Sequence, residues 1–265
     1  MIINNNIPAL NTRNQLYNTN LSTQKSMEKL SSGKRINRAA DDAAGLSISE
    51  KMRAQIRGLN QATRNAQDGI SFIQTAEGAM DEISNMLGRM KELLVEKSNG
   101  TYNDDDTANI DLELKQLGTE IDNITTNTKF NDKSSFTATV RITIRDDGAT
   151  GLTINPVVLT SITGLGAKVS GATTAANAIV AVETAIKSVN STRASYGAMQ
   201  NRLESTVRSL KTTTENLQAS ESRIRDTDMA EEMSNFTKNN ILVQAGTAML
   251  AQANQQPQNV LSLLR

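Results

Sequence analysis

The chemistry open to this chain is narrow, because its 265 residues include no Cys, His or Trp. Thiol and imidazole catalysis, disulfides and most zinc sites are thereby excluded. Carboxylates remain, and they are dense at Asp41–Asp42 and at Asp104–Asp106. Neither place has the calcium-loop pattern of a glycine at the sixth position and a closing glutamate. We interpret Asp104–Asp106 as a solvated loop, and we expect no catalytic residue, no metal and no cofactor.

Charge and hydropathy limit the classes of partner and the cellular locations that we expect for the chain. The 28 Lys and Arg residues balance 28 Asp and Glu residues, and no basic run occurs, so we expect no nucleic acid partner. No run approaches the ~18 apolar residues of a membrane span, so we expect no membrane insertion. Residues 1–8 have neither the basic region nor the apolar region of a cleaved secretory signal. Composition alone therefore favours a cytoplasmic protein, or one exported without a cleaved signal.

Apolar residues spaced alternately by three and four positions predict a long helix at each end of the chain. The N-terminal series is Ile3, Ile7, Leu10, Tyr17 and Leu21, with Asn14 in the vacant position. The C-terminal series is Met233, Phe236 and Val243, with Asn240 in the polar position, followed by Leu250 and Leu264. We expect the two helices to pair through these residues. Asn14 and Asn240 either face each other and set the register or face solvent.

The same spacing predicts helices at about 44–97, 107–127 and 174–222 in the middle of the chain. Alternating apolar and polar residues at 140–145 and 152–154, around a turn at 146–148, predict a β-hairpin within 130–163. Residues 157–162 are a candidate extra strand. The predicted fold class is mainly α: a long antiparallel helical bundle or coiled coil with its terminal helices paired, plus one small β-hairpin region.

Residues 33–46 separate the first two helices. Gly33 suits the left-handed backbone that ends a helix, and Asp41 and Asp42 suit the start of the next one. This segment is either a charged linker between helices or a joint between two separately packed layers.

Several stretches together are similar to bacterial flagellins. They are the opening residues 2–11, the connector 30–48, residues 63–71 and 74–80, residues 196–204, and the C-terminal run 223–264. They occur in the order and spacing of that family and cover roughly residues 1–131 and 174–265. Only residues 130–173 join the two arms, so the resemblance is to a short form without the variable outer domains.

The resemblance implies a subunit that polymerises into the hollow helical flagellar filament used for swimming. Residues 1–32 and 225–265 would form its inner tube, 33–46 a spoke and 47–224 its outer tube. The resemblance assigns assembly contacts in the spoke to Lys34, Arg35, Asn37, Arg38, Asp41 and Asp42.

The partners implied are other copies of the chain, a filament cap, hook-junction proteins and an export chaperone. Type III export would place the protein outside the cell without a cleaved signal. Arg89, Leu93 and Glu113 match positions that the flagellin-sensing Toll-like receptor contacts, whereas Gly88 departs from that pattern. The alternatives are a flagellar hook–filament junction protein and a secreted monomeric coiled-coil effector.

Overall fold

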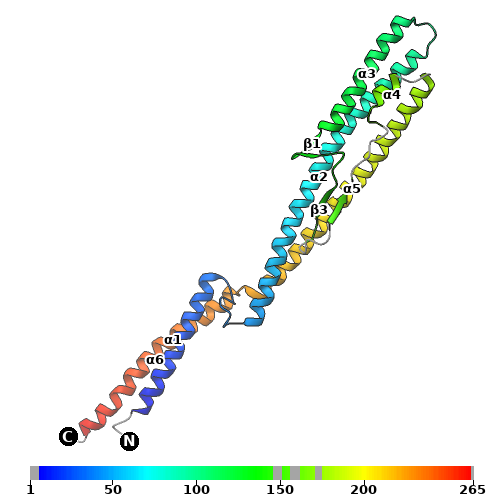
Figure 1. The fold of residues 1–265 in the computed structure, drawn as a ribbon. Helices are drawn as coiled ribbons and strands as arrows, with labels where there is room; N and C mark the ends of the chain where they lie inside the picture. Colours follow the sequence, from blue (N-terminus) through cyan, green and yellow to red (C-terminus); the bar gives the residue numbers. More distant parts are fainter. Residues whose placement is uncertain (1–5, 146–150, 156–161, 171–174, 264–265) are drawn as a thin grey trace. The chain divides into compact units, whose positions relative to one another are not determined.

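The computed structural model describes residues 6–145, 151–155, 162–170 and 175–263, and it divides into two compact units. Unit 1 comprises Met1–Ala54 and Glu215–Arg265, and unit 2 comprises Gln55–Thr214. Two long helices, α2 (Ala43–Lys97) and α5 (Ala175–Arg225), contribute residues to both units (Figure 1). The mainly α fold class with paired terminal helices and a small β region is confirmed.

Unit 1 is built on α1 (Ile7–Ser32) and α6 (Met229–Leu263), which run antiparallel side by side (Figure 1). The side chain of Asn6 caps α1 by accepting the Ala9 N–H at 3.1 Å, and its amide donates to the Ala253 carbonyl at 2.8 Å. At the other end Gly33 takes φ 69° and donates its N–H to the Lys29 carbonyl. The predicted glycine stop is therefore present, since this backbone conformation is easy only for glycine.

Unit 2 packs α2 and α5 with α3 (Asp104–Asn127) and α4 (Leu165–Ser170). The α2 core residues follow the predicted heptad spacing and are fully buried: Ile73, Met80, Ile83, Leu87, Met90 and Leu94. The interpretation of Asp104–Asp106 as a loop is wrong, because these residues form the first turn of α3. Asn103 and Asp106 make a capping box there, and carboxylates stabilise the positive end of a helix.

Two antiparallel strand pairs lie against these helices. The predicted hairpin is β3 (Val140–Thr143) with β4 (Gly151–Ile154), in the register Val140 opposite Ile154. The predicted turn at 146–148 and residues 157–161 of the candidate strand lie outside the described residues, and Ile162 is a buried turn residue. A second pair, β1 (Lys129–Phe130) with β2 (Lys133–Ser134), was not predicted.

Close backbone contacts fix the return of the chain toward α5. The Asp122 carboxylate accepts the Gly164 N–H at 3.0 Å, and Gly164 has φ 68°. Gly118 of α3 and Gly166 of α4 approach so closely that a Cβ on Gly166 would lie 3.0 Å from the Gly118 Cα. In the part of the chain that the structure describes, no helix is both long and apolar enough to span a bilayer.

Candidate functional site

Residues 33–42, called the connector below, are held by backbone hydrogen bonds to the segment between α5 and α6. The Arg35 N–H donates to the Arg225 carbonyl at 2.7 Å, and the Thr227 N–H donates to the Gly33 carbonyl at 3.1 Å. These bonds flank an antiparallel bridge between Lys34 and Asp226. The segment that follows α1 and the segment that precedes α6 are thereby paired in unit 1 like two strands of a minimal sheet.

Side chains close the connector into a fixed turn. The Asp41 carboxylate accepts the N–H groups of Arg38 at 3.0 Å and Asn37 at 3.1 Å, and these two bonds hold the pKa of Asp41 below its usual value. The Asn37 amide donates to the Ser32 hydroxyl at 2.8 Å, and the Arg35 guanidinium donates to the Ile224 carbonyl at 2.6 Å. Arg38 points outward and pairs with Glu28 at 3.0 Å.

Beneath this turn lies Ile36, which is only 1% exposed. Asp42 caps α2 by accepting the Gly45 N–H at 2.8 Å. A Cβ on Gly45 would lie 2.8 Å from Ile36 Cδ1, so glycine is what lets α2 begin directly against Ile36. Ile36 was not among the predicted site residues, although it is the only large apolar residue between Gly33 and Gly45.

Arg225 is a second residue of this site that was not predicted from the sequence. It is 9% exposed, and its guanidinium donates to Glu50 at 2.6 Å. The hydrogen bond from Arg225, followed by that from Arg53, lowers the pKa of Glu50. Among the described residues, Arg225 Nε and Thr227 Oγ1 are buried without a hydrogen-bond partner. Sequence pattern could not reveal this ion pair, because its members lie 175 residues apart.

The face of α1 that packs on α6 consists mostly of small residues. Between Ile7 and Met27 its least exposed positions are Ala9, Thr12, Leu16, Thr19, Thr23 and Ser26. Each threonine donates its hydroxyl to a carbonyl of α1 four residues earlier, so its methyl group is left for packing. Opposite Leu16, α6 offers Gly246, where a Cβ would lie 3.1 Å from Leu16 Cδ1. Small residues therefore let these two helices approach closely.

The prediction of which α1 residues pack on α6 is wrong. Ile7, Leu10, Asn14, Tyr17 and Leu21 are all exposed, and Tyr17 is 64% exposed. At 100° per residue these positions lie on the side of α1 turned away from the Thr-rich face. The periodicity correctly marked an apolar stripe, but it could not say which partner the stripe contacts.

On α6 some of the predicted pairing residues are half-buried and one is exposed. Phe236, Asn240, Val243 and Leu250 are half-buried, whereas Met233 is exposed and does not belong to the pairing face. Asn14 is exposed, which favours the alternative in which it faces solvent, and Asn240 is half-buried. Ile3 and Leu264 lie outside the described residues.

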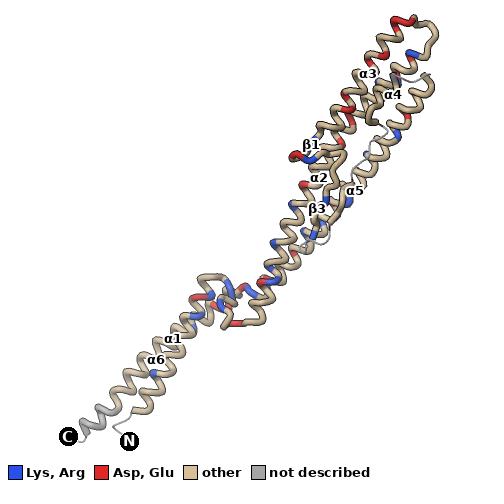
Figure 2. The backbone as a smooth tube through the Cα atoms, viewed as in Figure 1, with Lys and Arg blue, Asp and Glu red and all other residues tan. Residues whose placement is uncertain are grey.

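Unit 1 consequently carries an unusual exposed surface. Its exposed large apolar side chains are Ile7, Leu10, Tyr17, Leu21, Met27, Ile48, Met229, Met233, Ile241, Leu242 and Met249. Charged residues gather near the connector and are sparse along the rest of α1 and α6 (Figure 2). An apolar surface of this extent on a pair of helices is typical of an interaction site.

The third predicted site lies in unit 2. Arg89 donates to Glu113 at 3.1 Å and to Glu92 at 3.3 Å, and the Glu113 bond is the main reason that the pKa of Arg89 is raised. Leu93 is only 2% exposed and belongs to the core, so its predicted role as a receptor contact is wrong. Arg89 and Glu113 remain together on the surface.

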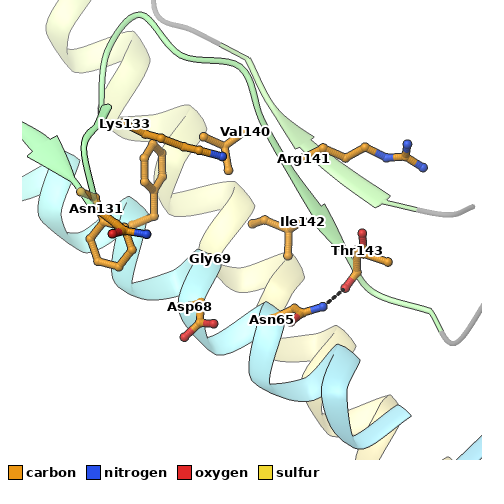
Figure 3. Close-up of a pocket in the computed structure, with 11 residues that line it drawn as sticks. Asn65, Asp68, Gly69, Asn131, Lys133, Val140, Arg141, Ile142 and Thr143 are labelled. Atoms are coloured by element: carbon orange, nitrogen blue, oxygen red, sulfur yellow. Dashed lines mark hydrogen bonds between the residues drawn. The ribbon is translucent and has the colours of Figure 1, made fainter. Parts of the chain in front are cut away.

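A groove of about 320 Å³ lies between α2 and the strands (Figure 3). Its floor includes Phe72 and Ile142, and the Asn65 amide donates to the Thr143 carbonyl at 3.2 Å on one side. Asp68 and Lys133 are among the lining residues. Across the described ranges, no three acidic side chains gather where they could hold a metal ion.

Comparison with known proteins gives the family of the chain. The model of the bacterial flagellin N-terminal helical region matches residues 3–141, and that of the C-terminal helical region matches residues 179–264. Flagellin of Halalkalibacterium halodurans is 55% identical, and the flagellar filament 33 kDa core protein of Treponema phagedenis is 48% identical. Both alignments cover 100% of this chain and 100% of the relative.

A solved structure of a putative flagellar hook-associated protein from Vibrio parahaemolyticus shares the fold. It has a TM-score of 0.61 and 13% identity, and the match covers 70% of this chain and 100% of that one. The resemblance found in the sequence is confirmed by the two family models and the full-length relatives: the chain belongs to the bacterial flagellin family and is a member without large outer domains.

Proposed function

We propose that this chain is the structural subunit that polymerises into the hollow helical bacterial flagellar filament used for swimming. The observation that carries the proposal is the exposed apolar surface of α1 and α6, in a chain that belongs to the flagellin family. Leaving such a surface in water is unfavourable by about 25 cal/mol per Å², and other copies of the same chain are a natural cover. The function is structural, with no catalytic role.

Within the filament, α1 and α6 form the inner tube, and residues 47–224 form the outer tube. Residues 33–46 are the spoke between the two layers. The outward charge of Arg38 and the fixed turn at Asn37 and Asp41 support this role, because a rigid turn presents its charges at set positions to a neighbour. Lys34, Arg35 and Asp42 serve mainly to hold the shape of the spoke.

The finished polymer lies outside the cell, and the subunit reaches it through type III export without a cleaved signal. The export chaperone binds before assembly, and the hook-junction proteins and filament cap contact the two ends of the polymer. The exposed surface of α6 supports the chaperone contact, since an apolar helix must be covered until the chain is exported.

The test replaces two apolar residues of the exposed stripe by acids, in the variant Tyr17→Glu/Leu21→Glu. Purified protein is added to short filament seeds, and growth is followed by light scattering and electron microscopy. We expect elongation to fall at least about tenfold, because burying unpaired carboxylates between subunits is costly. The matched control, Tyr17→Phe/Leu21→Met, keeps the stripe apolar and should elongate at nearly the original rate.

The proposal would be contradicted if the acidic variant elongated at the wild-type rate while circular dichroism showed that its monomer helicity was unchanged. The same assay separates the alternatives. A hook–filament junction protein or a monomeric effector would not extend the seeds over micrometres by itself. The shared fold of the Vibrio protein does not favour the junction alternative, because 13% identity carries the fold alone.

We also propose that the free subunit is recognised by the flagellin-sensing Toll-like receptor through Arg89 and Glu113. Their contact at 3.1 Å on the surface of unit 2 supports this second function, whereas buried Leu93 takes no direct part. The variant Arg89→Ala/Glu113→Ala should reduce the signal of a receptor reporter cell line. An unchanged dose–response curve would count against the proposal.

A further inference from the structure

Nine of the ten methionines lie among the described residues, and their exposure differs between the two units. In unit 2 Met80 and Met90 are fully buried, and Met86 and Met199 are half-buried. Every methionine that the described structure leaves exposed lies on the terminal helices of unit 1: Met27, Met229, Met233 and Met249. Their exposed fractions run from 48% to 61%.

Exposure decides the chemistry of a methionine. Its thioether is apolar and packs well, but an accessible sulfur is oxidised to the polar sulfoxide, whereas a buried one is protected. In this chain the accessible sulfurs therefore coincide with the surface assigned above to contacts between subunits.

We propose that Met27, Met229, Met233 and Met249 form a peroxide-sensitive modification site, whose oxidation prevents the free subunit from joining a filament. The inference rests on the proposed function and adds to it a chemical means of control. Met229 and Met233 lie four residues apart on one side of α6, so oxidising both would place two sulfoxides on a single contact strip.

The reaction is balanced with hydrogen peroxide as the oxidant. A lone pair of the thioether sulfur attacks one peroxide oxygen, and an S–O bond forms while the O–O bond breaks. The departing hydroxide takes a proton and leaves as water, so the sulfur loses two electrons and the peroxide gains them. A dithiol-dependent methionine sulfoxide reductase reverses the change, with the oxygen leaving as water and the dithiol becoming a disulfide.

The sulfoxide disfavours assembly for a physical reason. Its S=O group accepts hydrogen bonds from water, and this hydration is lost when the group is buried between apolar side chains without a donor. Along the stretch of α6 from residue 239 to 263, the sequence has no Lys or Arg that could pair with it. Met249 lies in that stretch, so its oxidation should be among the most disruptive.

The test compares the wild type with the quadruple variant Met27→Leu/Met229→Leu/Met233→Leu/Met249→Leu. Leucine keeps the volume and hydrophobicity but has no sulfur to oxidise. Each protein is treated as free subunit with hydrogen peroxide, mapped by peptide mass spectrometry and added to untreated seeds. We expect oxidation at these four residues before Met80 and Met90, and at least a tenfold loss of elongation rate for the wild type only.

Two further arms complete the test. Treating the oxidised wild type with methionine sulfoxide reductase should restore elongation. When intact filaments are treated with hydrogen peroxide, far less methionine sulfoxide should form at the four sites than in free subunits. If the quadruple variant elongates poorly before treatment, the four single Leu variants replace it, and each should recover part of the loss.

The proposal is overturned if the oxidised wild type elongates at its untreated rate, or if the Leu variants lose as much as the wild type. Failure of the untreated wild type to elongate at all would instead refute the filament function, and the inference with it.

Discussion

At the scale of single residues, Tyr196 shows how one side chain holds a loop on unit 2. Its hydroxyl donates to the Ser135 carbonyl at 3.4 Å, and both residues are buried next to Phe136. Burial raises the pKa of Tyr196 to about 12, because the phenolate would lose its hydration. The neighbouring Ser135 hydroxyl is buried without a partner among the described residues, so the loop is held at Ser135 by this contact and by the bond from the Ser135 N–H to the Thr128 carbonyl at 3.0 Å.

Tyr196→Phe should therefore change the response of unit 2 to alkali. A tyrosine whose pKa is raised by folding stabilises the fold at neutral pH, and that stabilisation is lost as pH rises from about 10 toward 12. At pH 7 the variant should lose about 0.5–1.5 kcal/mol with its hydrogen bond. In urea unfolding followed by circular dichroism, the gap between wild type and variant should close or reverse above pH 10.

Tyr17→Phe is the control for this experiment, since the Tyr17 ring is exposed. A gap for Tyr196→Phe that stays constant from pH 8 to pH 11.5 would show that the phenol does not titrate as its burial implies.

At the scale of elements, the seating of the hairpin on α2 depends on Gly69. A Cβ there would overlap the Ile142 side chain, whose Cγ1 would lie 3.1 Å away. The Ile142 side chain points toward α2 beside Gly69 in the groove (Figure 3). Nine residues further along α2, Gly78 is exposed and has no atom within 4 Å of an added Cβ.

This pair of glycines gives a matched prediction within one helix. Gly69→Ala should destabilise unit 2 by about 1–3 kcal/mol, because the hairpin must shift or strain to admit the methyl group. Gly78→Ala should stabilise it by up to about 1 kcal/mol, since alanine is the better helix former. Thermal unfolding of both variants measures the difference, and equal melting temperatures would show that β3 is not packed on α2 as described.

The elements also show which parts of the fold could be predicted from the sequence. The α2 core from Ile73 to Leu94 was predictable because its large apolar residues contact partners within the same chain. The α1 contact face was not, because it uses threonine methyl groups and close approach at Gly246, which carry no strong hydrophobic signal. Gly33, Asp41 and Asp42 of the connector were identified from their residue types, and its other site residues from the resemblance to flagellins. The pairing of Arg225 with Glu50 depends on tertiary folding and leaves no local pattern.

At the scale of the whole molecule, the two units differ in what holds each together. Unit 2 has a continuous core of large side chains from four helices and the strands. The α1–α6 contact of unit 1 relies on Ala, Thr and Gly, with few large residues such as Leu16 and Phe236 between the helices. Because this contact buries few large side chains, it offsets little of the free-energy cost of ordering two long helices.

Limited proteolysis should reveal this difference. In the free subunit, a protease of broad specificity should remove α1 and α6 first and leave a resistant fragment close to Gln55–Thr214. In the filament both ends should resist, because neighbouring subunits cover them. Mass spectrometry of the fragments over time gives the order of cleavage, and terminal helices that survive as long as unit 2 in the free subunit would contradict this prediction.

The pairing of the connector with residues 225–227 has a mechanical consequence for a rotating filament. Because the Arg35 N–H bonds the Arg225 carbonyl and the Thr227 N–H bonds the Gly33 carbonyl, moving the connector along residues 225–227 must strain or break both bonds. Sliding one segment along the other would load both hydrogen bonds in shear, so they would resist together instead of opening one after the other. Torque reaching a subunit would then be shared by two backbones, and failure would require both to part at once.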